Sequence, residues 1–457
     1  MQTFTSSVPL PVSADEAFAW HEQPGAFNRL QPPWERVLLE EGPTDGLKNG
    51  SRVQIKTWAG PISSRWKIRH DGYRPGVEFI DEMEAGPFKA WKHWHRFHKS
   101  EGEKCRLEDF IRWELPLPFF SEPLLRGWVS AKLERMFAYR HAITAHDLGL
   151  ASSAEKRVVL VAGGSGLIGR SLVPLLQTRG HEVRILSRQP KGRAGFYAWN
   201  PEEGSIDRRA LEGVDAVVNL AGENIAQRWS SAARQRILSS RVEATKTLVR
   251  ALGEVGVNGD LFLSASGVGF YGTNDVEQAD EAAPLGEGFL AAVCRDWEAE
   301  ALEAGARFSR VVLARLGLVL TPAGGALSKM LPAFLGGLGG RIGSGNQPMS
   351  VIGIEDVVQV FRFLIEESRT DGAVNLCLPN PVSNREFVAT LGRVLKRPTA
   401  IPLPGWAVKT LFGEMGEATL LAGTGAVPRV LLKEGYRFRQ ADLEGALRFC
   451  LGRLLKS

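Results

Sequence analysis

Three glycines follow an apolar run in the middle of the chain, at a spacing that suits phosphate binding. The segment VVLVAGGSGLIGR places Gly163, Gly166 and Gly169 after an expected strand at residues 157–162 and at the start of an expected helix. In such a loop the first glycine permits a tight turn, the second lets backbone N–H groups approach a pyrophosphate, and the third lets helix and strand pack closely. The helix N-terminus also favours negative charge. The pattern predicts a dinucleotide site.

The end of the second expected strand, residues 181–186, bears on which nicotinamide cofactor is bound. An acidic residue there would bond the ribose 2′-hydroxyl and favour NAD. This chain instead has Ser187 and Arg188, with Lys191 and Arg193 close behind. Because a guanidinium makes bidentate contacts with a phosphate, the sequence favours NADP(H) over NAD(H). The alternative is that these are solvated loop charges.

The residues expected around the cofactor lie in the glycine loop, after the strands that follow it, and on one helix. They are Gly163, Gly164, Ser165, Gly166, Leu167, Ile168, Gly169, Ser187, Arg188, Leu220, Ala221, Gly222, Arg241, Ser264 and Ala265.

Regularly alternating strands and helices in the middle of the chain are expected to position these residues. Further apolar runs at residues 216–220, 261–264 and 310–314 alternate with expected helices. Apolar runs bounded by helices indicate strands buried on both faces, and hence a parallel sheet. The predicted fold is α/β, a Rossmann-type parallel sheet with helices on both faces.

The first 148 residues follow another pattern, rich in Trp, His, Phe and Pro. Short strands are expected at residues 51–58, 63–70, 77–81, 90–98 and 107–115, followed by a helix at 122–142, which predicts an α+β domain. The strand WKHWHRFH would place Trp91, His93, His95 and Phe97 on one face. This face is interpreted as a wall of a ligand cavity or as cross-strand packing. A His-x-His metal pair is a third alternative, but the sequence places no companion ligand, so no metal site is predicted.

Bulk properties exclude several classes of protein. The chain has 457 residues, enough for two or three domains, and a formal net charge of +5 without a Lys/Arg block that would indicate nucleic-acid binding. The four cysteines lack CxxC spacing, and no apolar run approaches the ~20 residues of a membrane helix. The first residues do not resemble a signal peptide. We therefore expect a cytoplasmic protein that binds a small molecule, without nucleic-acid binding or membrane insertion.

Several segments together resemble a known family. GGSGLIG, NLAG at residues 219–222 and SAS followed by YG between Ser264 and Gly272 resemble the extended short-chain dehydrogenase/reductases. The longer stretches NLAGENIAQRWS, SSRVEATKTLV and CRDWEAEA are similar to an atypical NAD-dependent epimerase/dehydratase-like family with poorly defined substrates. That resemblance runs from Arg157 to the C-terminus and includes a short C-terminal domain of unknown function, the DUF1731 type.

The N-terminal segments WHEQPGAFNRLQPPWE and GPFKAWKHWHRFHK resemble START-like (SRPBCC) helix-grip domains. This resemblance implies a curved sheet around a helix, with an apolar cavity for a hydrophobic ligand. The predicted domains are thus residues 1–148 (START-like), 157–395 (Rossmann epimerase-like) and 396–457 (C-terminal).

The resemblance also implies catalytic positions, and here the chain departs from the superfamily. Working members use a serine to polarise the substrate oxygen, then a tyrosine as acid/base and a lysine four residues later. Ser266 takes the serine position, but Leu290 and Cys294 stand at the tyrosine and lysine positions. Leucine carries no proton and cysteine no fixed positive charge, so the usual hydride mechanism lacks two groups.

Two other residues are candidate substitutes. Tyr271 follows Ser266 closely, and Glu223 follows a strand at the edge where α/β sheets build their sites. Their alternative roles are a packing residue and a helix cap. Two hypotheses follow: an NADP(H)-dependent oxidoreductase or epimerase acting on a small, partly apolar molecule, or a non-catalytic NADP(H)-binding sensor or assembly factor.

Overall fold

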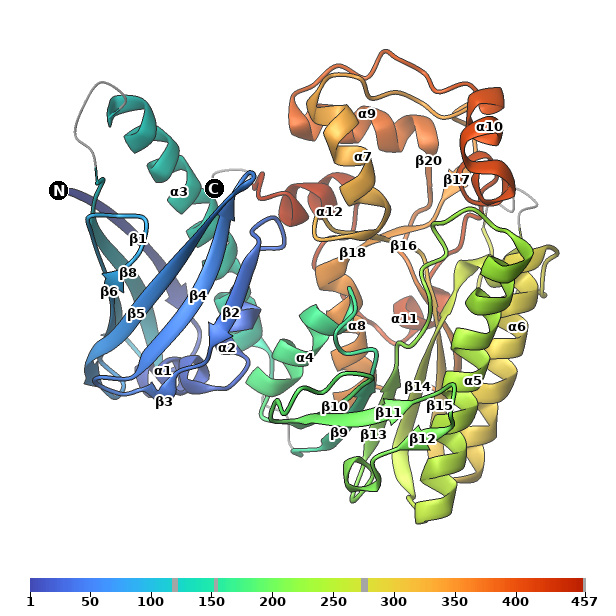
Figure 1. Cartoon of the computed structure of the whole chain (residues 1–457), viewed down its shortest axis with the longest axis horizontal. Coiled ribbons are helices and arrows are strands. Elements are labelled where there is room, and N and C mark those ends of the chain that lie inside the picture. Colours follow the sequence, from blue (N-terminus) through green and yellow to red (C-terminus); the bar gives the residue numbers. More distant parts are fainter. Residues whose placement is uncertain (117–121, 152–154, 273–277, 455–457) are drawn as a thin grey trace. The chain divides into compact units, whose positions relative to one another are not determined.

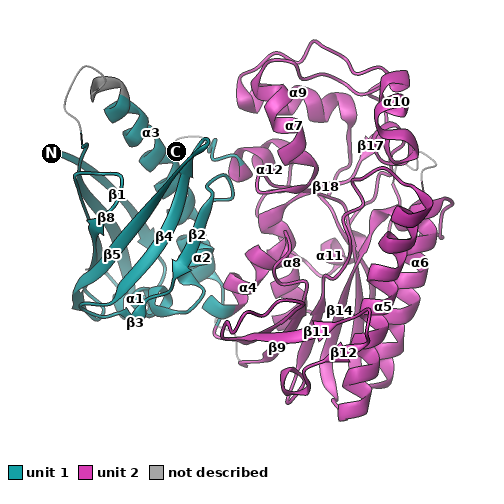
Figure 2. Cartoon of the chain, viewed as in Figure 1, with its two compact units in different colours: residues 1–153, 177–179, 451–457 teal, residues 154–176, 180–450 magenta. Residues whose placement is uncertain are grey.

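The computed structural model describes residues 1–116, 122–151, 155–272 and 278–454. The chain forms two compact units (Figure 2): residues 1–153, 177–179 and 451–457 in one, and residues 154–176 and 180–450 in the other. The last predicted domain, from residue 396, thus shares a unit with the Rossmann region up to residue 450. Within the described residues, no helix combines the length and the apolar character needed to cross a membrane.

The first unit is a seven-stranded antiparallel sheet with three helices (Figure 1). The strand order is β1-β8-β7-β6-β5-β4-β2. The elements in chain order are β1 (Gln2–Leu10), α1 (Ala14–Glu22), α2 (Ala26–Arg29), β2 (Val37–Glu41), β3 (Thr44–Leu47), β4 (Arg52–Ala59), β5 (Ile62–Arg74), β6 (Glu78–Ala85), β7 (Ala90–Ser100), β8 (Lys104–Glu114) and α3 (Glu122–Gly149).

One face of this sheet is buried against helices α1 and α3. Alternate residues of β8, Ile111 and Trp113, pack against Val129, Leu133 and Phe137 of α3. The amphipathic helix expected at 122–142 is confirmed and continues to Gly149, although Leu125 and Trp128 are exposed and do not belong to its buried face.

Helix α1 was not predicted, although its start carries a recognisable signal. The Ser13 hydroxyl accepts from the Glu16 backbone N–H at 3.2 Å, and the Glu16 carboxylate accepts from the Ser13 N–H at 3.0 Å. This capping box satisfies two backbone donors and fixes where the helix begins.

The second unit is built on an eight-stranded sheet of order β12-β11-β10-β9-β13-β14-β15-β19, parallel except for β12. The elements that build this sheet are β9 (Val158–Ala162), α4 (Gly169–Thr178), β10 (Glu182–Ser187), β11 (Phe196–Asn200), β12 (Ser205–Ile206), η1 (Arg208–Ala210), β13 (Ala216–Asn219), α5 (Ser231–Val255), β14 (Gly259–Gly267), η2 (Val268–Tyr271), α6 (Phe289–Leu302), η3 (Glu303–Ala306), β15 (Phe308–Leu316), α8 (Ile354–Glu366) and β19 (Gly372–Leu376).

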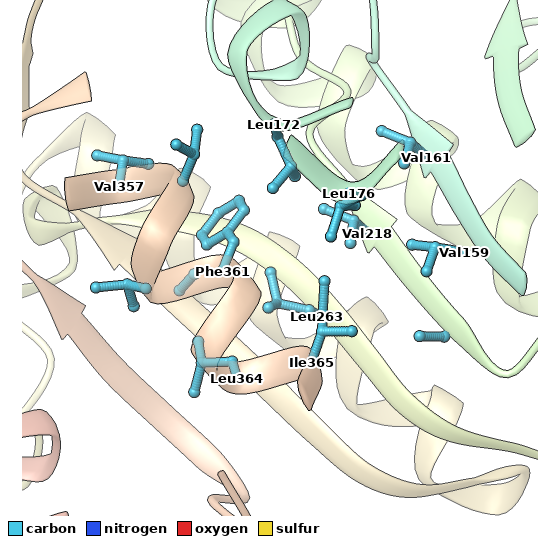
Figure 3. Close-up of a cluster of buried hydrophobic side chains, with 14 of the residues drawn as sticks. Val159, Val161, Leu172, Leu176, Val218, Leu263, Val357, Phe361, Leu364 and Ile365 are labelled. Carbon is cyan, nitrogen blue, oxygen red and sulfur yellow. The ribbon is translucent and has the colours of Figure 1, made fainter. Parts of the chain in front are cut away.

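Both faces of this sheet are buried, which explains the continuous apolar runs. Val159 and Val161 of β9 pack with side chains of α4 and α8 in the core drawn in Figure 3. Leu160 and Ala162 of the same strand pack in a second core with side chains of α5 and α6. The predicted Rossmann-type sheet with helices on both faces is therefore confirmed.

The remaining elements follow β15 and surround the carboxyl ends of the strands (Figure 1). They are β16 (Leu318–Leu320), α7 (Gly325–Leu335), β17 (Pro348–Met349), β18 (Val351–Gly353), β20 (Val382–Ser383), α9 (Asn384–Leu395), α10 (Gly405–Gly416), the π-helical turn η4 (Glu417–Leu421), α11 (Arg429–Lys433) and α12 (Leu443–Cys450). A parallel bridge between Ala279 and Ala426 ties this C-terminal region to the loop after β14.

Candidate cofactor and active site

The glycine loop joins β9 to α4, and two of its glycines are required by sterics. Gly163 has φ +78°, and a Cβ there would lie 2.7 Å from the Leu220 carbonyl oxygen. A Cβ at Gly169 would lie 2.5 Å from Cα of Gly164. Gly166 is exposed, and its Cβ would meet only the Gly163 oxygen at 3.1 Å. The tight turn and the close helix packing expected of this loop are both present, and its middle faces solvent.

The strand ends beside this loop hold the other predicted cofactor residues. Parallel strands β9, β10, β13 and β14 end at one edge of the sheet, which brings Ser187, Leu220 to Gly222, and Ser264 together with the glycine loop. The buried Asn219 amide donates to Thr245 Oγ1 at 2.8 Å and to Ser264 Oγ at 3.3 Å. Its carbonyl oxygen accepts from the Ala221 N–H at 3.2 Å, so Asn219 fixes the backbone of this edge.

Arg188 lies just past the end of β10 with its side chain exposed. Its guanidinium has no hydrogen bond or ion pair with any residue that the structure describes, whereas Arg193 stacks at 3.8 Å on the ring of Phe196. The Ser187 hydroxyl accepts from the Gln189 backbone N–H at 3.1 Å. Arg188 is thus a cation placed beside the glycine loop and available to an anion.

Ser266, the predicted catalytic serine, is buried at the end of β14. Its hydroxyl donates to Glu298 Oε1 at 2.6 Å. Glu298 in turn receives two hydrogen bonds from Arg315, both of 2.9 Å. The side chains of Glu298 and Arg315 are only 7% and 6% exposed, so the ion pair is shielded from water.

Tyr271 belongs to the same buried network, which we call the Ser266–Asn375 network. Its hydroxyl donates to Asn375 Oδ1 at 2.7 Å and accepts from Arg315 Nη1 at 3.1 Å. Arg315 also lies 3.4 Å above the ring of Phe270. Burial raises the pKa of Tyr271 to about 12, so the phenol keeps its proton at neutral pH.

Helix α6 carries the residues that replace the superfamily's tyrosine and lysine. Leu290, Cys294 and Glu298 recur every four residues and share one face of the helix. Cys294 Sγ lies 3.6 Å from the Gly267 carbonyl oxygen, next to Ser266. Burial raises the pKa of the Cys294 thiol to about 11, so it is neutral and offers neither a base nor a positive charge.

Glu223 lies in the loop after β13, and Arg241 lies on α5 next to this loop. The Glu223 carboxylate accepts from Gln227 Nε2 at 2.9 Å and from Arg236 Nε at 3.2 Å, and these contacts lower its pKa. Arg241 donates to the backbone oxygens of Ile237 and Glu223, at 2.8 and 2.9 Å. Arg241 therefore supports the loop backbone, while Glu223 is an ionised, one-third exposed carboxylate at the edge.

Sequence reasoning missed Glu298, Arg315 and Asn375. A signal for the first two existed, because Glu298 lies one helical turn after Cys294 and Arg315 follows the apolar run Val311–Ala314 within its strand. A charge in a buried position requires a partner, so each predicts the other. Asn375 lies in β19, far along the chain, and nothing near it in sequence indicated its neighbours.

The region around this site matches known proteins. The model of the NAD dependent epimerase/dehydratase family matches residues 159–377, and the domain of unknown function DUF1731 matches residues 403–450. An epimerase family protein of Mycobacterium bovis is 45% identical over 298 residues, which cover 65% of this chain and 98% of that protein. The chain belongs to this epimerase family. Epimerase family protein SDR39U1 of Bos taurus is 39% identical, over 64% of this chain and 98% of its own length.

Two solved structures are also similar to this chain. The crystal structure of human epimerase family protein SDR39U1 with NADPH is 36% identical, with a TM-score of 0.60, over 65% of this chain and 100% of that one. The nucleoside-diphosphate sugar epimerase from Corynebacterium glutamicum has a TM-score of 0.79 at 29% identity, over 98% of this chain and 90% of that one. The similarity to the Corynebacterium structure therefore extends over the N-terminal unit as well.

Proposed function

We propose that this epimerase-family chain binds NADP(H) at the glycine loop, with Arg188 holding the 2′-phosphate. The observation that carries the proposal is the exposed, unpaired guanidinium at the end of β10, beside a loop whose glycines leave room for a pyrophosphate. The NADPH bound to the 36%-identical human SDR39U1 supports it. No acidic residue stands at the end of β10 to select NAD.

Calorimetric titration of the full chain with NADPH and NADH tests this assignment. Arg188→Asp should weaken NADPH binding by roughly 10- to 100-fold, the usual value of a charge-assisted hydrogen bond, and leave NADH binding unchanged. Arg208→Asp is the matched control, because this arginine is 73% exposed and precedes β13, at the opposite edge of the sheet. Equal affinities for both cofactors, unchanged by Arg188→Asp, would reject the assignment.

For the reaction, we propose an oxidoreductase or epimerase acting on a small, partly apolar molecule. When bound, the nicotinamide supplies or accepts hydride. In this proposal Ser266 turns its hydroxyl from Glu298 to a substrate oxygen. Glu223, the one-third exposed carboxylate, takes the proton of a substrate alcohol when it is oxidised and returns a proton to the oxygen when a carbonyl is reduced. Tyr271 holds Arg315 in place rather than transferring a proton. Turnover of NADPH with a panel of carbonyl compounds, lost in Ser266→Ala and Glu223→Gln, is the expected result.

The second candidate is a non-catalytic NADP(H) sensor or assembly factor. It is favoured by Leu290 and Cys294 at the tyrosine and lysine positions, and by the buried, protonated phenol of Tyr271. This candidate requires NADPH binding with a change in hydrogen exchange at the sheet edge and no hydride loss across the panel. Turnover abolished by Ser266→Ala would exclude it.

For the N-terminal unit, we propose a START-like role as a ligand-binding module. The order of elements supports it: a strand, two short helices, an antiparallel sheet and a long closing helix, α3. Native mass spectrometry of the full chain should detect a co-purified hydrophobic molecule, and a ligand-free mass throughout would count against this role.

The four cysteines are unpaired and buried, which suits a reducing compartment such as the cytoplasm.

A further inference from the structure

Polar side chains form a belt through the interior of the N-terminal unit, between the sheet and its helices. All of them lie on five adjacent strands or on the helices that cover them. The belt consists of Ser6 (β1), His70 (β5), Asp81 (β6), His93 and His95 (β7), Asp109 (β8), His21 (α1) and His141 (α3). Neither the proposed cofactor site nor the family assignment uses any of these residues.

Strand register brings carboxylates to the two histidines of β7. Asp81 of β6 lies opposite His93 on one side and opposite His70 of β5 on the other. Asp109 of β8 lies opposite His95. These are the companion ligands that the His-x-His motif lacked in the sequence, because pairing between strands far apart in the chain cannot be read from one strand.

Three of these residues converge on one point. Asp81, His93 and His95 each offer a ligand atom, and the three atoms all lie within 4.8 Å of one another. His95 Nε2 is 3.3 Å from Asp81 Oδ2, longer than the typical hydrogen bond of about 2.9 Å. Two donors at about 2.0 to 2.1 Å from a tetrahedral ion lie about 3.3 Å apart. The distance between these two atoms therefore fits a metal ion between them as well as a long hydrogen bond.

The other atom of each of these side chains is held by a second layer of residues. His95 Nδ1 lies 2.9 Å from Asp109 Oδ1, and Asp81 Oδ1 lies 2.8 Å from His70 Nδ1. His93 Nε2 lies 2.8 Å from Asp109, which leaves His93 Nδ1 without a partner among the described residues. In metal sites the second ring nitrogen of a histidine ligand is usually bound to a carboxylate in this way.

The positions of these ligands are fixed by packing as well. The ring of His95 stacks on Phe79 with centroids 4.1 Å apart, and His141 of α3 binds the second oxygen of Asp109 at 2.7 Å. Preorganised ligands reduce the cost of binding an ion.

We propose that Asp81, His93 and His95 bind a divalent transition-metal ion of the Zn²⁺ type, with Asp109 and His70 orienting the ligands. Imidazole and carboxylate donors without thiolate suit Zn²⁺, Fe²⁺, Mn²⁺ or Co²⁺. The carboxylates of Asp81, which is partly buried, and Asp109, which is buried, supply the negative charge that a dication needs. Three protein ligands leave a fourth position open, as in metal sites that receive water or a small ligand.

Metal content and cobalt spectroscopy of the full chain test the proposal. After incubation with Zn²⁺ or Co²⁺ and dialysis, we expect about one equivalent of metal by mass spectrometry, and visible Co²⁺ bands of a four-coordinate site. Asp81→Asn and His93→Gln should each weaken binding by at least 10- to 100-fold. His98→Gln is the matched control, because His98 lies on the same strand, faces the other side and is 43% exposed.

Substitutions inside the belt can unfold the unit, so the effect of metal on the Tm of the unaltered chain is measured as well. Excess Zn²⁺ should raise the Tm of this unit by several degrees, and a chelator should reverse the rise. If the unaltered chain retains less than about a tenth of an equivalent of either ion and its Tm does not respond, the belt is a hydrogen-bonded network alone. Metal binding that persists in Asp81→Asn and His93→Gln would likewise overturn the proposal.

Discussion

Removing the Glu298 carboxylate should destabilise the second unit more than any surface change on the same helix. In Glu298→Ala, the Arg315 guanidinium loses both of its 2.9 Å contacts while it stays buried, and the Ser266 hydroxyl loses its acceptor. Breaking a buried pair from one side costs about 3–5 kcal/mol, because an uncompensated charge remains.

The structure places the expected cost at the lower end of that range. Arg315 keeps the Tyr271 hydroxyl at 3.1 Å and the face of Phe270 at 3.4 Å, so part of its charge remains solvated by the protein. We therefore expect a loss of about 3 kcal/mol in the free energy of unfolding, a factor of roughly 10² in the unfolding equilibrium. Adding Arg315→Met to Glu298→Ala should recover part of this loss, because the unpaired charge is then removed.

Urea unfolding followed by hydrogen exchange and mass spectrometry measures this effect. Peptides from β14, α6 and β15 report the second unit separately from the first. The control is Asp296→Ala, whose carboxylate forms an exposed ion pair with Arg295 on α6 and whose loss should have no measurable effect. A Glu298→Ala variant as stable as this control would refute the argument, as would a double variant less stable than Glu298→Ala alone.

Two further predictions concern the glycine loop and the thiols. Gly163→Ala should cost about 3 kcal/mol or more in urea unfolding, because it combines left-handed strain with a carbonyl at 2.7 Å, whereas Gly192→Ala, with φ +66° and open space, should cost only about 1 kcal/mol; equal losses would contradict the steric account. Cys294, with its pKa raised to about 11, is a thiolate in only about one molecule in a thousand at pH 8. Iodoacetamide followed by peptide mass spectrometry should leave Cys294 and the other three buried cysteines unmodified in the folded chain and label all four in urea, and labelling of folded Cys294 at pH 8 would contradict its burial.

The sequence predicted elements correctly where burial leaves a recognisable pattern of apolar residues. Strands β9 and β14 pack on both faces of the sheet, so their continuous apolar residues predicted them. The glycine spacing predicted the loop between β9 and α4. Strands β11, β12 and β19 were missed because they are short and include polar residues such as Asn200, Ser205 and Asn375. Strand β1 was missed because the consecutive polar residues Thr5, Ser6 and Ser7 resemble an irregular segment.

The site shows the same division. Ser266 was proposed from the family resemblance, and Tyr271 and Glu223 from their positions near strand ends. Their partners were not predicted, because those partners come from α6, β15, β19 and the start of α5. In the first unit, His93 and His95 were predicted to share one face of their strand, and both are buried. The carboxylates beside them depend on strand register, which a single sequence does not reveal.

The Ser266–Asn375 network also bears on how the chain folds as it is synthesised. The Asn375 amide donates to the backbone oxygens of Ala279 and Val427, and Glu281 accepts from the Val430 N–H. Val427 and Val430 leave the ribosome about 50 residues after β19, a delay of roughly 3 to 10 s at about 5–20 residues per second, whereas Ala279 and Glu281 precede this strand. Until then the buried side-chain amide of Asn375 lacks its Val427 acceptor, although β19 can already pair with β15. Complete hydrogen bonding of the Ser266–Asn375 network therefore depends on the C-terminal region, which is synthesised last.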